Sequence, residues 1–146
     1  MLAEDLKSLL ASSYAFTIKA QYFHWNVEGP DFYQLHEFFQ DVYEEVYASI
    51  DTIAEHIRTL DEYTPGSFER FAELTVVQGQ ILVPRAELML EELLSDCEAM
   101  INLLNDCFSS AENENKQGVA DYIAGRIDAF RKHQWMLRSF TKKDRA

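Results

Sequence analysis

The chain has 146 residues, of which 47% are hydrophobic and 26% charged, enough for one globular domain that buries roughly two-thirds of its unfolded surface. Only 5 glycines and 3 prolines, with 13% aromatic residues, argue against a disordered, collagen-like or turn-rich all-β chain. The formal charge of −12 disfavours binding to DNA phosphates and favours cations. We therefore expect one acidic, helical domain over residues 1–146.

The first predicted helix runs from Leu6 to about Glu28, because apolar residues recur there every three or four positions. Gly29, Pro30 and Asp31 then supply a helix stop, a turn and an N-cap for the next helix. The stripe of this first helix consists of Leu6, Leu9, Leu10, Tyr14, Ile18, Tyr22 and Trp25.

The second predicted helix starts at Asp31 and reaches Leu60, long enough to span a small bundle. Helix-breaking residues follow at Thr64-Pro65-Gly66, and a short extra helix is predicted from Ser67 to Glu73. The stripe of the second helix consists of Leu35, Phe38, Phe39, Val42, Val46, Ile50, Ile53, Ile57 and Leu60.

The third predicted helix has Pro84 in its first turn and an apolar stripe that ends at Phe108. A polar segment from Ser109 to Gln117 separates it from a fourth helix between Val119 and Phe140. These elements predict an all-α four-helix bundle with a short extra helix in the connection between helices two and three. That connection is the only long one, so it is expected to carry a crossover.

The two cysteines and the length of the apolar runs indicate in which cellular compartment the protein is expected. Cys97 and Cys107 lie ten residues apart in one predicted helix, about 15 Å along its axis, so they cannot form a disulfide with each other. Such cysteine usage is typical of a reduced compartment. The N-terminal residues lack the layout of a signal peptide, and no apolar run approaches the ~20 residues that span a bilayer. A cytoplasmic protein without membrane contact is expected.

Helix bundles often hold two metal ions through Glu-x-x-His pairs, since positions i and i+3 face the same way. No such pair exists in this chain. The residues three positions before His24, His36, His56 and His133 are Gln21, Tyr33, Ile53 and Phe130. The usual di-iron site within one subunit is therefore excluded.

His24, His36, Asp51 and Glu55 remain as candidate metal ligands. His36 and Asp51 are fifteen residues apart on one predicted helix, about 22 Å, so one subunit cannot bring both to one metal. If the four residues act together, two copies of the second helix must pack antiparallel about a two-fold axis. Alternatively, Asp51 and Glu55 form a solvated helix face and His36 is an ordinary first-turn residue.

The run His24-Trp25-Asn26-Val27, the triplet Leu35-His36-Glu37 and the run Asp51-Thr52-Ile53-Ala54-Glu55 resemble the signature of the Dps family, ferritin-like mini-ferritins that protect DNA during starvation. The resemblance implies a hollow homododecamer of 23 symmetry built from antiparallel two-fold dimers. It also implies ferroxidase sites at dimer interfaces, with His24 and His36 from one subunit and Asp51 and Glu55 from its partner. The implied reaction is oxidation of Fe(II), by hydrogen peroxide in preference to dioxygen, and storage of the ferric mineral.

This sequence departs from the family pattern at one position. The family usually has an aspartate four residues after the second histidine, where this chain has Gln40. An amide oxygen brings no charge and binds a hard cation less well than a carboxylate does. We therefore expect at most two irons per site, the second held only during turnover, with zinc or another divalent cation able to replace iron.

The resemblance also suggests roles outside the metal ligands. Trp25 stands where the family has an aromatic residue that can absorb oxidising equivalents, although packing would equally explain it. Asp121 is the candidate residue for an acidic pore that admits iron, with a solvated helix face as the alternative. His56 and His133 are expected to be structural. An acidic patch that could face the cavity and seed mineral consists of Glu37, Asp41, Glu44 and Glu45.

Two other functions compete with the ferroxidase shell. Gln40 favours a non-catalytic shell of the same fold that binds a single metal or is purely architectural. The second rival is a nucleoid-binding protein that uses the basic segment from Arg138 to Arg145. That segment is short and no lysine precedes Lys7, so DNA binding is expected to be weak or absent.

Overall fold

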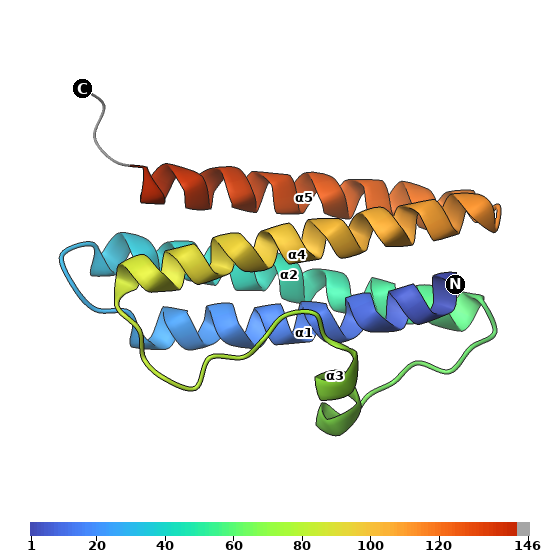
Figure 1. The fold of residues 1–146 in the computed structure, drawn as a ribbon, viewed down its shortest axis with the longest axis horizontal. Helices are drawn as coiled ribbons and strands as arrows, with labels where there is room; N and C mark the ends of the chain where they lie inside the picture. The colour runs from blue at the N-terminus through green and yellow to red at the C-terminus, as the bar shows by residue number, and fades with distance from the viewer. Residues whose placement is uncertain (143–146) are drawn as a thin grey trace.

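The computed structural model describes residues 1–142, in which four long helices pack side by side and a short helix lies on the connection between two of them (Figure 1). The predicted all-α, ferritin-like four-helix bundle is thus confirmed. α2 and α4 run in the same direction because their connection passes along the length of the bundle (Figure 1). The helices are α1 (Leu2–Asn26), α2 (Phe32–Thr59), α3 (Phe68–Leu74), α4 (Ala86–Asn113) and α5 (Gln117–Thr141).

The core lies between the four long helices, each of which turns its apolar stripe inward. Phe16 of α1 meets Phe130 of α5 edge to face, with ring centroids 5.3 Å apart. Phe23 of α1 and Phe39 of α2 make a second aromatic contact at 6.1 Å. All four rings are fully buried, so they tie α1 to both of these neighbours.

The crossover connection is held to α1 by side chains of that helix. Ser8 Oγ donates to the carbonyl of Leu74 at 2.7 Å, and Ser12 Oγ accepts from the amide of Val76 at 2.9 Å. The ring of Tyr14 stacks on Phe71 of α3 at 5.0 Å. The connection is therefore a fixed layer over α1, which agrees with the crossover predicted for this link.

Lys19 of α1 is the buried centre of a charged cluster that joins this connection to α4. Its Nζ lies 2.8 Å from Oδ2 of Asp96 and 3.3 Å from Oε1 of Glu92, and it donates to the carbonyl of Gln78 at 3.1 Å. Gln80 donates to both oxygens of Glu92. Burial raises the pKa of Asp96, which the lysine opposes. Among residues 1–142, Lys19 is the only cation paired with these two carboxylates, so it compensates their buried charge.

The turn between α1 and α2 differs from the prediction in its capping. α1 ends at Asn26, two residues before the expected end. Gly29 adopts a φ of 120°, a left-handed conformation that favours glycine, and its carbonyl accepts from the amide of Phe32. Asp31 occupies the N-cap position, but its carboxylate makes no capping hydrogen bond, so that part of the prediction is wrong. The backbone of the turn caps the helix instead.

α4 differs from its predicted bounds at both ends. Pro84 precedes the helix and does not lie in its first turn, because Arg85 is the extended N-cap residue. At the other end the helix continues to Asn113, so the predicted polar separator is mostly helical. Ala111 extends the buried stripe, while Ser110 Oγ donates to Asp5 Oδ2 at 2.6 Å. Asn115, with a φ of 57°, makes the turn that ends the helix.

α3 matches its prediction closely. It spans Phe68–Leu74, and the side chain of Ser67 caps it by accepting from the amide of Arg70 at 3.2 Å.

Both cysteines are free, as predicted from their spacing, and both are buried. Burial raises the pKa of the Cys107 thiol to about 12 and raises that of Cys97 as well, so both stay protonated. Within residues 1–142, no helix combines the length and apolar character needed to cross a membrane.

Candidate metal site

The two histidines of the candidate site meet where α1 ends and α2 begins. Their rings stack with centroids 3.9 Å apart and planes 14° from parallel. Nδ1 of His24 lies 2.7 Å from the carbonyl of His36, and Nδ1 of His36 lies 2.8 Å from the carbonyl of His24. A carbonyl can only accept, so each neutral ring carries its proton on Nδ1 and keeps the lone pair of Nε2 for another partner.

The helix ends create this reciprocal pair. The carbonyl of His24 belongs to the last turn of α1, where no intrahelical amide remains to bond it. The side chain of His36 satisfies that carbonyl from the second turn of α2. Phe32 stacks on His36 at 5.2 Å, and Tyr43 meets the ring of His24 edge-on at 5.4 Å. Both imidazoles are therefore held in one orientation with the same tautomer, as metal-binding histidines generally are.

Gln40 lies one turn after His36 on α2 and is half-buried. Its Nε2 donates to Oε1 of Glu44 at 2.8 Å. Because a carboxylate accepts only, the nitrogen end of the amide is the end that faces Glu44. The carbonyl oxygen of Gln40, on the other branch of the planar amide, is therefore not bonded to Glu44 and remains able to accept from or coordinate another group.

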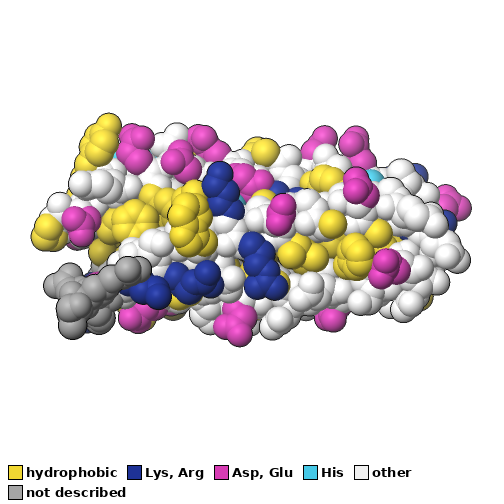
Figure 2. All heavy atoms as spheres, turned by 90° about the horizontal axis from the view of Figure 1, so that it is seen from above, with side chains coloured by type: hydrophobic (Ala, Val, Ile, Leu, Met, Phe, Trp, Pro, Cys, Tyr) yellow, Lys and Arg dark blue, Asp and Glu magenta, His cyan; other side chains and the backbone are white. Residues whose placement is uncertain are grey.

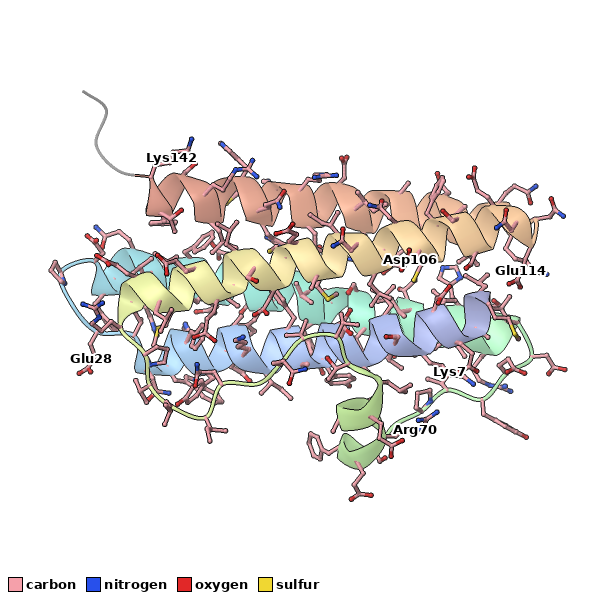
Figure 3. The ribbon with its side chains drawn as sticks, viewed as in Figure 1. Lys7, Glu28, Arg70, Asp106, Glu114 and Lys142 are labelled. Atoms are coloured by element: carbon pink, nitrogen blue, oxygen red, sulfur yellow. The ribbon has the colours of Figure 1, made fainter. Side chains whose placement is uncertain are left out.

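Asp51 and Glu55 are exposed on α2, one turn apart on the same side of the helix. They lie toward the C-terminal end of α2, away from the α1–α2 turn, where Figure 3 labels Glu28. Among residues 1–142, no three or more His, Cys, Asp or Glu side chains gather closely enough to hold a metal ion. One subunit brings the two histidines together but does not bring the two carboxylates to them.

Trp25 and Asp121 are both on the surface of the single chain. Trp25 follows His24 directly, and 64% of its surface is exposed, so packing within the subunit does not explain it. Asp121 is exposed near the start of α5, where it lines a hollow with Glu112 and Lys116 at the α4–α5 turn. Its surroundings thus contain both signs of charge.

Glu45 does not belong to the predicted acidic patch, which corrects that expectation. It turns toward α5 and binds both guanidinium Nη atoms of Arg126, with Nη2 at 3.2 Å, and Nε2 of His133 at 2.7 Å. Both partners are buried. Burial by itself raises the pKa of Glu45, but the hydrogen bonds from His133 and Arg126 outweigh it and hold that pKa at about 2. Glu37, Asp41 and Glu44 are exposed in the single chain.

This cluster predicts a pH dependence of stability. The Glu45 pKa falls from 4.5 to about 2 on folding, so its stabilisation is complete above about pH 4.5 and is lost as the pH falls toward 2. A Glu45→Gln variant should therefore lose less stability over this interval than the parent protein does. Thermal unfolding at several pH values between 6 and 2.5 measures it, with the exposed Glu98→Gln as control. Parallel curves for parent and Glu45→Gln would contradict the assignment.

The remaining histidines have structural contacts, as predicted. His133 belongs to the Glu45 cluster and meets Phe130 edge to face at 5.6 Å. His56 is half-buried against the ring of Tyr122 at 5.1 Å. The hydroxyl of Tyr122 donates to the carbonyl of Ser49 at 3.2 Å. His133, through Glu45, and His56, through Tyr122, therefore each connect α2 with α5.

The predicted basic segment lies only partly within the described residues. Figure 2 shows the face over α5, where basic side chains gather toward the C-terminal end between acidic ones. Arg131, Lys132 and Arg138 are exposed on this helix. Lys143 and Arg145 of the predicted segment lie outside the described residues. The visible basic strip is short, and acidic groups flank it.

Sequence reasoning missed the residues that hold the candidate ligands in place. Phe32, Tyr43 and Glu44 contact His36, His24 and Gln40 respectively. A signal was present for two of them, because Phe32 precedes His36 by four positions and Glu44 follows Gln40 by four. The contact of Tyr43 depends on how α1 packs on α2, which spacing along one helix does not give.

Comparison with known proteins places the whole chain among ferritin-like proteins. A family model described as a ferritin-like domain matches residues 3–146. An uncharacterized low temperature-induced protein of Nostoc sp. is 38% identical over 133 residues, covering 90% of this chain and 74% of that protein. DNA protection during starvation protein 2 of Bacillus anthracis is 34% identical over 137 residues, with 94% of each covered. Dps from Staphylococcus aureus has a TM-score of 0.94 at 27% identity, covering 98% of this chain and 96% of that one.

Proposed function

The chain belongs to the Dps family of ferritin-like proteins, and from this membership we propose that it oxidises Fe(II) with hydrogen peroxide and stores the ferric mineral in a hollow shell. The relative from Bacillus anthracis is named for DNA protection during starvation. For this chain we propose that the protection is chemical, because removal of Fe(II) and peroxide together prevents their reaction near DNA.

The observation that supports this proposal most is the reciprocal bonding of His24 and His36. Two stacked imidazoles with both Nδ1 protons occupied keep two Nε2 lone pairs available. Neutral imidazole suits Fe(II) and Zn(II), and a carboxylate adds the charge that a harder cation requires. Asp51 and Glu55 supply that charge from the partner subunit in our proposal. About 22 Å along α2 separate Asp51 from His36, and Glu55 lies one turn farther away, so a site within one chain is excluded.

We propose that two subunits pair antiparallel about a two-fold axis, so that each dimer holds two such sites. Six dimers then form a dodecamer of 23 symmetry, as in the family generally. The two free, buried cysteines fit a reduced compartment, so we place the shell in the cytoplasm. Asp121 would lie on the path by which Fe(II) enters, where its carboxylate attracts cations.

Electron counting favours peroxide as the oxidant for a paired site. Two Fe(II) ions each give one electron to hydrogen peroxide, which takes up two protons and leaves as two water molecules, so no hydroxyl radical is released. Asp51 and Glu55 balance the charge that grows as Fe(II) becomes Fe(III), and the histidines remain neutral ligands. When only one iron is present, Trp25, which follows His24 and is exposed, can supply the second electron that hydrogen peroxide requires.

Stopped-flow absorbance of ferric iron tests this proposal. The assembled protein should accelerate oxidation of Fe(II) by hydrogen peroxide over protein-free buffer and should keep the product in solution as a mineral core. A rate equal to that of buffer would overturn the enzymatic proposal. It would favour the second candidate, a non-catalytic shell that binds one metal per site, to which the neutral side chain of Gln40 lends support.

Binding to DNA is expected to be weak or absent because of the charge of −12. A gel-shift assay at low and at physiological salt measures it. A complex retained at physiological salt would favour the nucleoid-binding alternative.

A further inference from the structure

His36, Gln40 and Glu44 form one stripe on α2, each one turn beyond the last. Within this stripe the amide of Gln40 stands between an imidazole and a carboxylate, and its Nε2 donates to Glu44 at 2.8 Å. Glu44 is exposed and Gln40 is half-buried. The amide of Gln40 is therefore anchored from the solvent side of the stripe.

The orientation of this amide decides whether Gln40 can bind a cation. A glutamine amide has one end that can coordinate metal, the carbonyl oxygen, and one end that repels it, the NH₂ group. Rotation by 180° about the last side-chain bond exchanges the two ends and costs little by itself. A fixed acceptor for the NH₂ group is thus needed to keep the oxygen turned the other way.

We propose that Glu44 is a positioning residue that turns the carbonyl oxygen of Gln40 toward the His24–His36 pair, where it serves as the neutral ligand of the second, weaker metal ion. The inference rests on the proposed function, because it assigns a residue to the same site. In this arrangement Glu44 does not touch the metal. The charge that an aspartate at position 40 would supply is missing, but the oxygen is kept in place.

The interaction has a clear signature in a double-mutant cycle. Glu44→Ala removes the acceptor and should weaken binding of the second ion about tenfold, the usual size of such an effect on metal affinity. In a Gln40→Asp background, both ends of the side chain are oxygens and no orientation is needed. There Glu44→Ala should leave the affinity of the second ion unchanged.

Isothermal titration of the assembled shell with Co(II), which peroxide-free buffer does not oxidise, provides the measurement. The matched control is Asp41→Ala, which removes an exposed carboxylate from the same helix three positions away. We expect the first Co(II) of each site to be unaffected by Glu44→Ala, and the control to behave as the parent protein does.

Three results would overturn the inference. Equal weakening by Glu44→Ala in both backgrounds would show that Glu44 acts by its charge or as a ligand itself. No weakening in either background, or equal weakening by Asp41→Ala, would remove the positioning role. In each of these three cases the proposed function is not contradicted, provided that the parent protein binds Co(II). A parent shell that binds no Co(II), or binds it equally after His24→Ala, contradicts the proposed function as well.

Discussion

Peroxide-driven oxidation of Fe(II) should fall by about a hundredfold or more when Asp51→Asn and Glu55→Gln are combined. The two carboxylates are the only charged groups of the proposed ligand set, so without them two Fe(II) ions would meet uncompensated positive charge and neutral imidazoles alone. Stopped-flow absorbance should then show the rate of protein-free buffer. Both positions are exposed in the single chain, so the substitutions should leave the fold of the subunit intact.

A matched control distinguishes loss of ligands from loss of negative charge. Glu98→Gln removes an exposed carboxylate from α4 and should leave oxidation at the parental rate. Circular dichroism and sedimentation should show that the double variant still folds and assembles. Parental activity in a folded Asp51→Asn, Glu55→Gln protein would contradict the assignment of these carboxylates.

Lys19→Met should destabilise the subunit by about 3–5 kcal/mol, the usual cost of breaking a buried ion pair from one side. The lysine side chain is 4% exposed and faces Asp96, at 13%, and Glu92, at 22%. Methionine keeps most of the volume but removes the cation that pairs with both carboxylates. The free energy of unfolding, measured in urea, should show this loss.

Neutralising the two carboxylates as well tests whether their unpaired charge causes the loss of stability in Lys19→Met. The triple variant Lys19→Met, Glu92→Gln, Asp96→Asn should regain most of the lost stability, because no buried charge is left without a partner. As a control, Arg70→Ala breaks the exposed pair of Arg70 with Glu73 and should cost less than about 1 kcal/mol. A Lys19→Met effect as small as this control would contradict the account.

Most of the fold could be predicted because each long helix has a regular apolar stripe. The prediction was wrong where a polar segment, which was expected to be a loop, is helical in the structure. Residues from Ser109 to Asn113 are mostly polar, yet they remain helical because Ala111 is buried and Ser110 is bonded to Asp5 of α1. The apolar pattern of one helix cannot predict this contact, because Ser110 and Asp5 are 105 positions apart in the sequence and lie on different helices.

The candidate ligands could be chosen from the sequence, but their surroundings could not. Spacing along α2 showed that His36 and Asp51 cannot share a metal within one chain. The stacking of His24 on His36 depends on the turn at Gly29, which returns α2 alongside α1. Glu45 was assigned to the acidic patch because its partners, Arg126 and His133, are more than eighty positions away in the sequence. Such long-range pairs are set by packing of α2 on α5.

Sharing of each site between two subunits is the central claim, and complementation tests it most directly. One chain carries His24→Ala with His36→Ala, and the other carries Asp51→Asn with Glu55→Gln. Neither should oxidise Fe(II) when assembled alone. In a mixed dimer, one site combines the intact histidines of one chain with the intact carboxylates of the other, while the second site carries all four substitutions.

With random pairing, about half of the dimers are mixed and each holds one intact site, so the mixed shells should recover about a quarter of the parental oxidation rate. Stopped-flow measurement on shells assembled from equal amounts of the two chains gives this number. Mixed shells that oxidise Fe(II) no faster than either variant alone would contradict a site shared between subunits.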